Sequence, residues 1–204
     1  MKNLTVAEFA QKTASNDPVP GGGSIAALAG ALSAALAEMV ASLTEGSPKY
    51  QEVKNEMADI KEKANLVSLS LLDDIEKDSE AFTKVMDAYR MPKATDEEKS
   101  KRSSAIQHAL KLAAEVPMSV AAKAYDIMEY SKAVVAKGNQ NAVTDGMVSA
   151  MMARTAVLSA LLNVKINLSS IKDENYTSSM KQKCAELEKK AVEKEKEILN
   201  SVKL

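Results

Sequence analysis

Residue types that support metal and nucleophilic chemistry are scarce in this sequence. Its 204 residues include one His, one Cys and no Trp. A single cysteine, Cys184, excludes a disulfide framework within the chain, and one His with one Cys cannot supply the usual ligands of a zinc site. The helical neighbours of His108, which are Ser104, Lys111 and Glu115, form a polar face, so His108 is a poor candidate for a catalytic triad. Catalysis would depend on carboxylates, backbone amides, Asn, Ser, Lys or Arg.

An excess of either charge is also missing. Lys plus Arg number 27 and Asp plus Glu number 28, which gives a net charge of −1. This balance offers no electrostatic reason to expect nucleic acid or an anionic membrane as a partner. The opening segment "MKNLTVAEFA" lacks the apolar core and cleavage pattern of a signal peptide. We therefore expect a cytoplasmic protein with no nucleic-acid and no membrane partner.

Helix-breaking residues are few. The chain has five prolines and seven glycines, is 46% hydrophobic, and shows almost no β-branched alternation. The length fits one domain or two small ones, and we predict a single all-α domain over residues 1–204, a bundle of long and short helices. Capping patterns and turns place the expected helices at residues 5–15, 24–44, 48–89, 95–137 with a kink or new start at Pro117, and 173–202. A further helix follows Gly146, with an apolar stripe from Met147 to Leu161.

The stretch "DPVPGGGSIAALAGALSAALAEMV" places three glycines directly before a long apolar helix. The length of that helix is compatible with a membrane span, yet it contains eight alanines, several serines and Glu38. Ala26, Gly30 and Ala34 leave one flank without bulk, which allows another backbone to approach closely. We predict a buried helix at the centre of the bundle. A glycine turn that leads into a helix can hold an anion or act as a plain hinge.

An acid interrupts the apolar stripe of the helix over residues 48–89. The stripe runs from Val53 to Ile75 and resumes at Phe82, and the missing position is Asp78. An ionised carboxylate on a core face is paired, hydrogen-bonded, protonated or exposed to a wet pocket. Asp78 could therefore belong to a site, or it could cap a neighbouring helix or pair with an Arg.

A second polar turn, "GNQNAVTDG", separates two later helices. Its Thr144 and Asp145 could cap the following helix, whose apolar stripe contains Arg154. A buried Arg requires an acid or an anionic ligand. The last helix has one apolar side on a heavily charged rod, which is typical of a packing or dimer-forming helix, and Cys184 on that side is interpreted as a core filler.

Five blocks, in this order, carry a resemblance: "PVPGGGSIAALAGALSAALAEMV", "DSEAFTKVMDAYRMPKATDEEK", "AAEVPMSVA", "GNQNAVTDG" and "ALLNVKINL". They span Pro18 to Leu168, and the chain resembles the cyclodeaminase/cyclohydrolase family, which includes the cyclodeaminase half of formiminotransferase-cyclodeaminase. The sequence departs from the family pattern at "TDGMV", where the family more often has Ser before the Asp. The resemblance implies an all-helical homodimer that acts on one-carbon-substituted tetrahydrofolate, polyglutamylated forms included, with no metal and no cofactor besides the folate.

Two reactions follow from the resemblance. A cyclodeaminase closes 5-formiminotetrahydrofolate to 5,10-methenyltetrahydrofolate with loss of ammonia, and a cyclohydrolase adds water to the methenyl carbon to give 10-formyltetrahydrofolate. The first needs a proton donor, and the second needs a proton acceptor and an anion facing the cationic amidinium. We assign proton transfer to Asp78 and cation stabilisation or orientation to Asp145. The chain as given carries no transferase domain, and this favours the cyclohydrolase reaction slightly over the cyclodeaminase reaction.

The candidate substrate-binding residues come from both turns and their neighbours. The glycine turn would bend tightly and place N–H groups near Ser24 to hold a polar group, the asparagines would recognise the pterin edge, and Lys93 and Arg154 would meet the folate carboxylates. Each assignment has an alternative. The asparagines could cap a helix, Lys93 could be a solvated loop charge, and Arg154 could form a structural ion pair with a core acid. The full set is Pro20, Gly21, Gly22, Gly23, Ser24, Phe82, Lys93, Asn139, Asn141 and Arg154.

Two other classes of function stay open at this stage. The first is a noncatalytic helical dimer that keeps the scaffold and binds folate or a protein partner. The second is a membrane-associated protein built around residues 24–44. The intact polar turns argue against the first class, and solubility of the protein without detergent would argue against the second.

Overall fold

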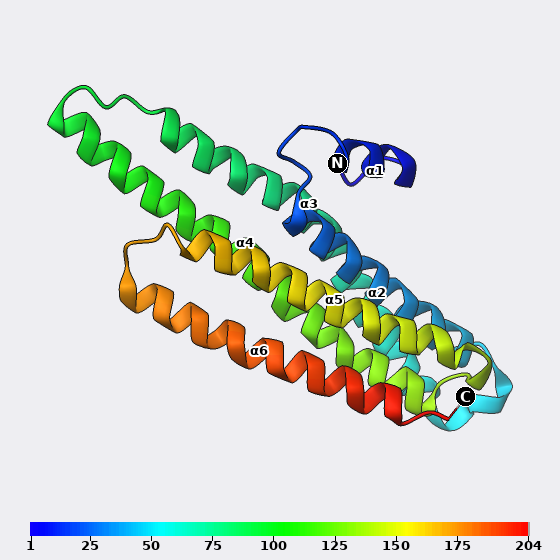
Figure 1. The fold of residues 1–204 in the computed structure, drawn as a ribbon. Coiled ribbons are helices and arrows are strands. Elements are labelled where there is room, and N and C mark those ends of the chain that lie inside the picture. Colours follow the sequence, from blue (N-terminus) through cyan, green and yellow to red (C-terminus); the bar gives the residue numbers. More distant parts are fainter. Residues whose placement is uncertain (204) are drawn as a thin grey trace.

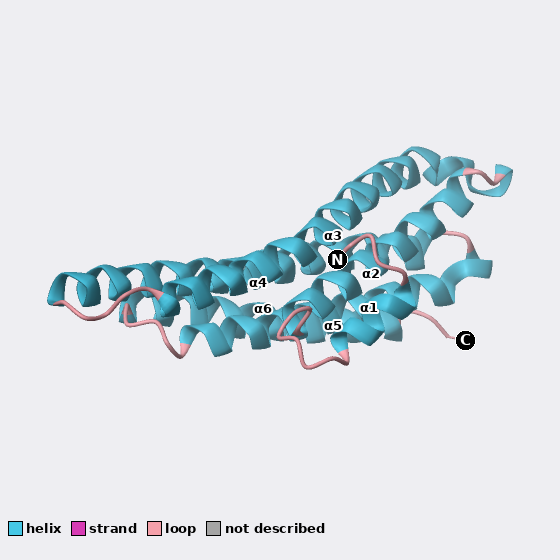
Figure 2. Cartoon of the chain, turned by 90° about the horizontal axis from the view of Figure 1, so that it is seen from above, coloured by secondary structure: helices cyan, strands magenta, loops and turns pink. Residues whose placement is uncertain are grey.

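The computed structural model describes residues 1–203, and these residues form helices with no strand (Figures 1 and 2). The all-α prediction is confirmed. Long helices lie side by side in an elongated bundle, and the short N-terminal helix is set apart from them (Figure 1). The α-helices are α1 (Val6–Thr13), α2 (Gly22–Glu45), α3 (Lys54–Arg90), α4 (Asp96–Lys137), α5 (Val143–Leu168) and α6 (Glu174–Asn200), and the 3₁₀ helices are η1 (Pro48–Val53) and η2 (Gln140–Ala142).

Local side-chain caps explain where several helices begin. Thr5 and Thr95 form complete capping boxes with Glu8 and Glu98, as their spacing predicts. Ser47 caps the segment that starts at Pro48, but that segment is the 3₁₀ helix η1, because Tyr50 has a non-helical backbone (φ −115°, ψ 34°). The predicted helix start is therefore displaced from Pro48 to Lys54.

Pro117 does not begin a new helix. It is buried inside α4, which runs without interruption from Asp96 to Lys137. A proline inside a helix removes one backbone hydrogen bond, and burial of its ring against the core compensates for part of that loss. Of the two alternatives predicted for Pro117, a kink or a new helix start, the helix start is wrong.

Helix α2 lies at the centre of the bundle, between α3 and α5. A Cβ on Gly30 would lie 3.0 Å from Leu71 Cδ1 of α3 and 3.5 Å from Ala156 Cβ of α5, so the small flank does admit both neighbours. The buried Ser33 hydroxyl donates to the Ser149 carbonyl at 2.7 Å. Both α2 and Gln140–Leu168 are apolar and long enough to span a membrane, but 61% of the α2 window is buried within the bundle.

Helix α6 packs on α4 and α5 of its own chain. Cys184 and Ile198 are buried on its apolar side, and burial raises the pKa of the Cys184 thiol. Ion pairs flank this contact, with Glu188 2.5 Å from Lys165 and Glu197 2.5 Å from Lys132. The packing role predicted for α6 is confirmed, and its apolar stripe is occupied within the chain.

Candidate active site

A groove opens where α2 begins. Asp78 contacts the first turn of α2 while α3 continues to Arg90, and Asn163 contacts Gly22 while α5 continues to Leu168. The space beyond the α2 N-terminus, between α3 and α5, is therefore open, with Ala113 of α4 also in its lining. Its volume is about 360 Å³, within the range of small-molecule sites. The lining residues are Pro18, Val19, Gly21, Gly22, Gly23, Asp78, Ala81, Phe82, Val85, Ala113, Asn163, Ile166 and Asn167.

Asp78 is the ionisable side chain in this lining. The Ser24 hydroxyl donates to Asp78 Oδ2 at 2.8 Å, and the Ser24 backbone N–H donates to the same carboxylate. Burial raises the pKa of Asp78 above its usual value, and the two Ser24 bonds oppose this shift in part. The broken stripe predicted an inward-facing acid, and that prediction is confirmed. Asp78 both caps a neighbouring helix and lines a groove.

Two glycines are required because side chains approach them closely. A Cβ on Gly23 would lie 2.1 Å from Asp78 Oδ1, and a Cβ on Gly22 would lie 3.0 Å from Asn163 Nδ2. No glycine among residues 1–203 has a positive φ, and Gly21 has φ −112°. These glycines therefore need no left-handed backbone, and the absence of side chains at Gly22 and Gly23 lets the Asp78 carboxylate reach the α2 N-terminus. The polar group bound near Ser24 belongs to the protein itself.

Asn163 and Asn167 are groove residues that the sequence interpretation missed. Asn163 Nδ2 donates to the Ser159 carbonyl at 2.9 Å, and Asn167 Nδ2 donates to the Ala113 carbonyl at 2.8 Å. These bonds fix both amides, whose oxygens remain suited to accept from a ligand. The sequence pattern that could have indicated them is a pair of asparagines one helical turn apart at the end of an apolar helix.

The second polar turn lies at the opposite end of α2. The Asn139 N–H donates to Thr44 Oγ1 at 2.8 Å, where α2 ends, and the Asn139 side chain accepts from the Asn141 N–H at 3.1 Å. Helix α2 has 24 residues, a length of about 36 Å. Asn139, Asn141 and Asp145 are therefore far from Asp78 within one chain. Asn139 caps the 3₁₀ helix η2, which is the capping role given as its alternative.

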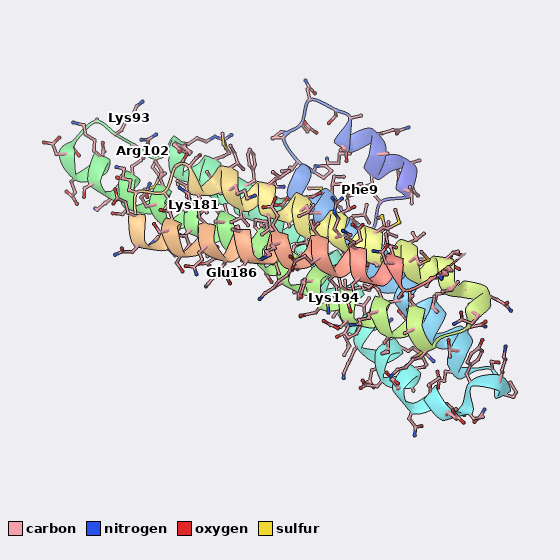
Figure 3. The ribbon with its side chains drawn as sticks, turned by 60° about the horizontal axis from the view of Figure 1, so that its bottom comes forward. Phe9, Lys93, Arg102, Lys181, Glu186 and Lys194 are labelled. Atoms are coloured by element: carbon pink, nitrogen blue, oxygen red, sulfur yellow. The ribbon has the colours of Figure 1, made fainter. Side chains whose placement is uncertain are left out.

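The two predicted carboxylate-binding cations also lie outside the groove lining. Arg154 Nε is 3.6 Å from Glu195 Oε2 of α6, so Arg154 forms the structural ion pair that was its alternative role. Lys93 is exposed on the loop between α3 and α4, at the tip of the bundle (Figure 3). Phe82 does line the groove and is 37% exposed, while Pro20 is buried and is not among the lining residues.

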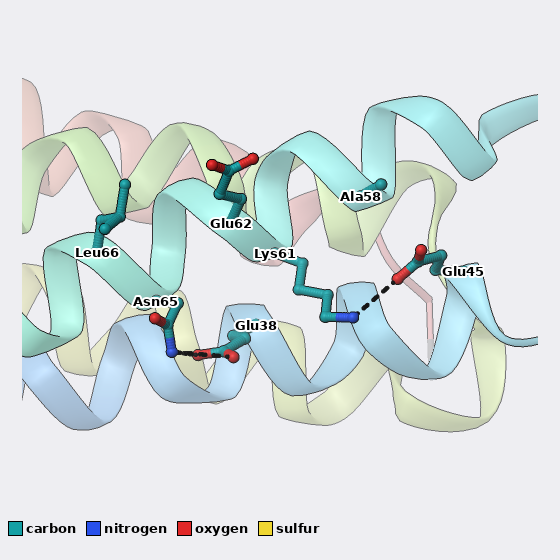
Figure 4. Close-up of a pocket in the computed structure, with 7 residues that line it drawn as sticks. All are labelled: Glu38, Glu45, Ala58, Lys61, Glu62, Asn65 and Leu66. Carbon is teal, nitrogen blue, oxygen red and sulfur yellow. Dashed lines mark hydrogen bonds and ion pairs between the residues drawn. The ribbon is translucent and has the colours of Figure 1, made fainter.

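Other parts of the molecule are less suited to chemistry. A shallow acidic hollow lies between α2 and α3, but Lys61 pairs with Glu45 at 3.1 Å and Asn65 binds Glu38 (Figure 4). No group of three His, Cys, Asp or Glu side chains within residues 1–203 could hold a metal ion. The groove at Asp78 is thus the best candidate site.

Comparison with known proteins connects this groove to a family. The family model described as formiminotransferase-cyclodeaminase matches residues 5–186, which include every groove residue. The chain belongs to the formiminotransferase-cyclodeaminase family. The resemblance carried by the five sequence blocks is thereby confirmed.

Relatives in this family include stand-alone and fused proteins. Methenyltetrahydrofolate cyclohydrolase of Methylorubrum extorquens is 40% identical, over 85% of this chain and 84% of that protein. Formimidoyltransferase-cyclodeaminase of Gallus gallus is 34% identical over 85% of this chain, which spans 32% of that protein. The crystal structure of formiminotetrahydrofolate cyclodeaminase from Thermotoga maritima matches with a TM-score of 0.86 at 34% identity, covering 97% of this chain and 94% of that one.

Proposed function

We propose that this protein is a folate one-carbon enzyme that hydrolyses 5,10-methenyltetrahydrofolate to 10-formyltetrahydrofolate in the Asp78 groove. The observation that carries the proposal is a partly buried carboxylate with a raised pKa, held at a helix N-terminus in a groove of ligand size. The 40% identity to a methenyltetrahydrofolate cyclohydrolase supports this choice of reaction. We further propose that the enzyme is a cytoplasmic homodimer without a metal or a cofactor besides the folate.

The proposed reaction uses Asp78 as a general base. The oxygen of a water molecule bonds to the methenyl carbon while one water proton passes to the carboxylate. The bond between that carbon and N5 then breaks, N5 keeps the electron pair and takes the proton from Asp78, and the hydroxyl proton leaves to solvent. The carbon remains on N10 as the formyl group.

Two properties of Asp78 suit this role. Its negative charge would face the cationic amidinium of the substrate in a partly desolvated groove, where electrostatic attraction is stronger than in water. Its raised pKa also brings its basicity closer to that needed for proton transfer near neutral pH. The Ser24 hydroxyl fixes the carboxylate orientation through the 2.8 Å bond.

Groove residues from α3 and α5 offer the remaining contacts. The side-chain oxygens of Asn163 and Asn167 can accept from the amino and N–H groups of a pterin, which is the task first assigned to Asn139 and Asn141. Phe82 and Ile166 provide apolar surface for a flat ring. The open groove leaves room for a folate tail, including a polyglutamylated one, to extend into solvent.

A second candidate is the cyclodeaminase reaction, which is favoured by the likeness to the Thermotoga maritima structure. In that reaction N10 attacks the formimino carbon, the N10 proton and one proton from Asp78 end on the departing nitrogen, and ammonia leaves. A raised Asp78 pKa favours the protonated donor that this step needs.

Absorbance of the methenyl form separates these reactions. Purified protein is given 5,10-methenyltetrahydrofolate or 5-formiminotetrahydrofolate in separate assays. Faster loss of the methenyl band establishes the cyclohydrolase, and its appearance from the formimino substrate establishes the cyclodeaminase. No turnover of either compound would contradict the proposed function and favour a noncatalytic binding protein.

A further inference from the structure

Helices α3 and α4 continue past the candidate active site as a pair. The loop that follows α5 meets α4 at Gln107, which donates to the Ser170 carbonyl at 3.1 Å. From there α4 extends back to Asp96 and α3 extends forward to Arg90, and the two helices form one end of the bundle (Figures 1 and 3). We call residues 86–106 the α3–α4 arm.

One face of this arm is in line with the groove. Tyr89 follows Asp78 by eleven residues on α3, and Arg102 precedes Ala113 by eleven residues on α4. Eleven residues make three helical turns to within about 20°, so Tyr89 and Arg102 lie on the same faces of their helices as these two groove residues. Their offset from the groove residues is about 16 Å along the helix axes.

Apolar side chains connect the groove to the arm. Phe82 and Val85 line the groove and lie between Asp78 and Tyr89 on α3, at the three- and four-residue spacing of one helical face. Tyr89 itself is 43% exposed, so its ring offers surface to a ligand. A long ligand that leaves the groove can therefore follow α3 as far as Tyr89 in contact with side chains.

Arg102 is held in place at the end of this path by Tyr89 (Figure 3). Its Nε and Nη2 atoms both donate to the Tyr89 carbonyl, at 3.2 and 2.9 Å. Its Cζ atom is also 5.7 Å from the centre of the Tyr89 ring, within the range of a cation–π contact. A half-buried guanidinium is thus fixed before any ligand arrives, which lowers the entropy that binding would cost.

No acid neutralises Arg102 within residues 1–203. Other cations of the same arm are paired, Arg90 with Asp87 at 3.3 Å and Lys99 with Asp96 at 2.8 Å. A guanidinium has five N–H donors, and its two bonds to the Tyr89 carbonyl leave three donors for a ligand. The planar fork of these donors matches the two oxygens of a carboxylate.

The charges at the two ends of the path are opposite. Asp78 is an acid, Arg102 is a cation, and the groove lining within residues 1–203 contains no Lys or Arg. A methenyl folate has the complementary order, a cationic amidinium at its ring system and carboxylates on its glutamate tail. We propose that Arg102, held against Tyr89, binds a carboxylate of that tail while the reacting carbon lies at Asp78. The substrate class in this assignment rests on the proposed function.

The offset along the arm selects one part of the tail. By standard bond lengths, the aminobenzoyl group and the first glutamate together extend roughly 10 Å from N10. The offset of about 16 Å exceeds that reach, so the carboxylate that meets Arg102 belongs to the second glutamate. A folate with a single glutamate would leave Arg102 unoccupied. Tail length is therefore a control that is built into the substrate.

Calorimetry tests this site without any need for turnover. The probes are 5-formyltetrahydrofolate, a stable reduced folate, and its triglutamate form. Wild-type protein should bind the triglutamate roughly 5- to 10-fold more tightly, an advantage that KCl reduces and that Arg102→Gln abolishes. Arg90→Gln, which removes the same charge from an exposed and already paired arginine of the arm, should keep it. Equal wild-type affinities, no binding of either probe, or an advantage that survives in Arg102→Gln would overturn the proposal.

Steady-state kinetics separates tail binding from a purely structural role of Arg102. With 5,10-methenyltetrahydrofolate as substrate, Arg102→Gln should raise KM for the triglutamate roughly 5- to 10-fold without a matching fall in kcat. Arg102→Lys, which keeps the charge but loses the fork, should retain a smaller preference for the triglutamate. Equal losses with both tail lengths would show that Arg102 only supports the end of α3, and would overturn the proposal. Affinity for the triglutamate that depends on Arg102 in a protein without turnover would contradict only the proposed reaction.

Discussion

Asp78 is subject to two opposing influences at the α2 N-terminus. Partial burial disfavours its ionised form, while the Ser24 hydroxyl, the Ser24 N–H and the positive end of α2 favour it. Burial has the larger effect, so the pKa is raised. The fold therefore maintains this carboxylate at some cost to stability, as expected of a functional group.

The stability of Asp78→Asn tests this balance. The raised folded pKa means that Asp78 is most favourable to folding below its unfolded pKa of about 3.9, and this contribution is lost as the pH rises through the folded value. We expect Asp78→Asn to unfold at the same temperature as the wild type near pH 4 and at the same or a higher temperature near pH 7.5. A much lower Tm of the variant at pH 7.5 would contradict the assignment.

Gly23 allows Asp78 to reach Ser24. Because the added methyl group would lie 2.1 Å from Asp78 Oδ1, Gly23→Ala should displace the carboxylate and lower kcat/KM by roughly 10- to 100-fold. Gly46→Ala is the control, since its Cβ would meet only the Ser42 carbonyl at an ordinary 3.4 Å. Equal steady-state kinetics for the two variants would show that the close approach at Gly23 does not matter.

At the scale of elements, a second acid on α3 has a different role. Asp74 is 2% exposed and pairs with Lys123 of α4 at 2.5 Å and with Lys77 at 2.7 Å. Lys123 also donates to Ser70. This cluster joins α3 to α4 about one helical turn before Asp78.

Removing Asp74 should therefore destabilise the bundle. Asp74→Ala leaves Lys123 without its buried partner, and we expect a loss of about 3 kcal/mol in the free energy of unfolding, measured by urea denaturation. Asp73→Ala is the control, because Asp73 is exposed and its salt bridge is to Lys2, which is also exposed. Similar denaturation midpoints for both variants would argue against a structural cluster at Asp74.

Sequence periodicity predicted which face of α3 is buried but not which partner lies opposite each residue. The gap at Asp78 was readable because three- and four-residue spacing defines a helical face. Asp74 was missed because its role depends on Lys123, 49 positions later, whose alignment is set by packing. Arg154 was predicted to need an acid, and the acid came from α6, a helix that spacing alone cannot position.

At the scale of the molecule, the long bundle explains which parts of the site could be inferred. Capping boxes and apolar stripes predicted the all-α bundle and the central α2, because these features depend on neighbours along the chain. The two polar turns were grouped into one site, yet α2 holds them at opposite ends. Asn163 was missed because only the antiparallel packing of α5 on α2 brings it to Gly22.

The most direct test of the account is the turnover of 5,10-methenyltetrahydrofolate by Asp78→Asn, followed by loss of the methenyl absorbance band. Asp87→Asn, an exposed acid on the same helix, is the matched control. We expect a roughly 10²- to 10⁴-fold lower kcat for Asp78→Asn with folding intact, the range for loss of a general base, and wild-type kinetics for Asp87→Asn. Wild-type turnover by folded Asp78→Asn would contradict the central claim.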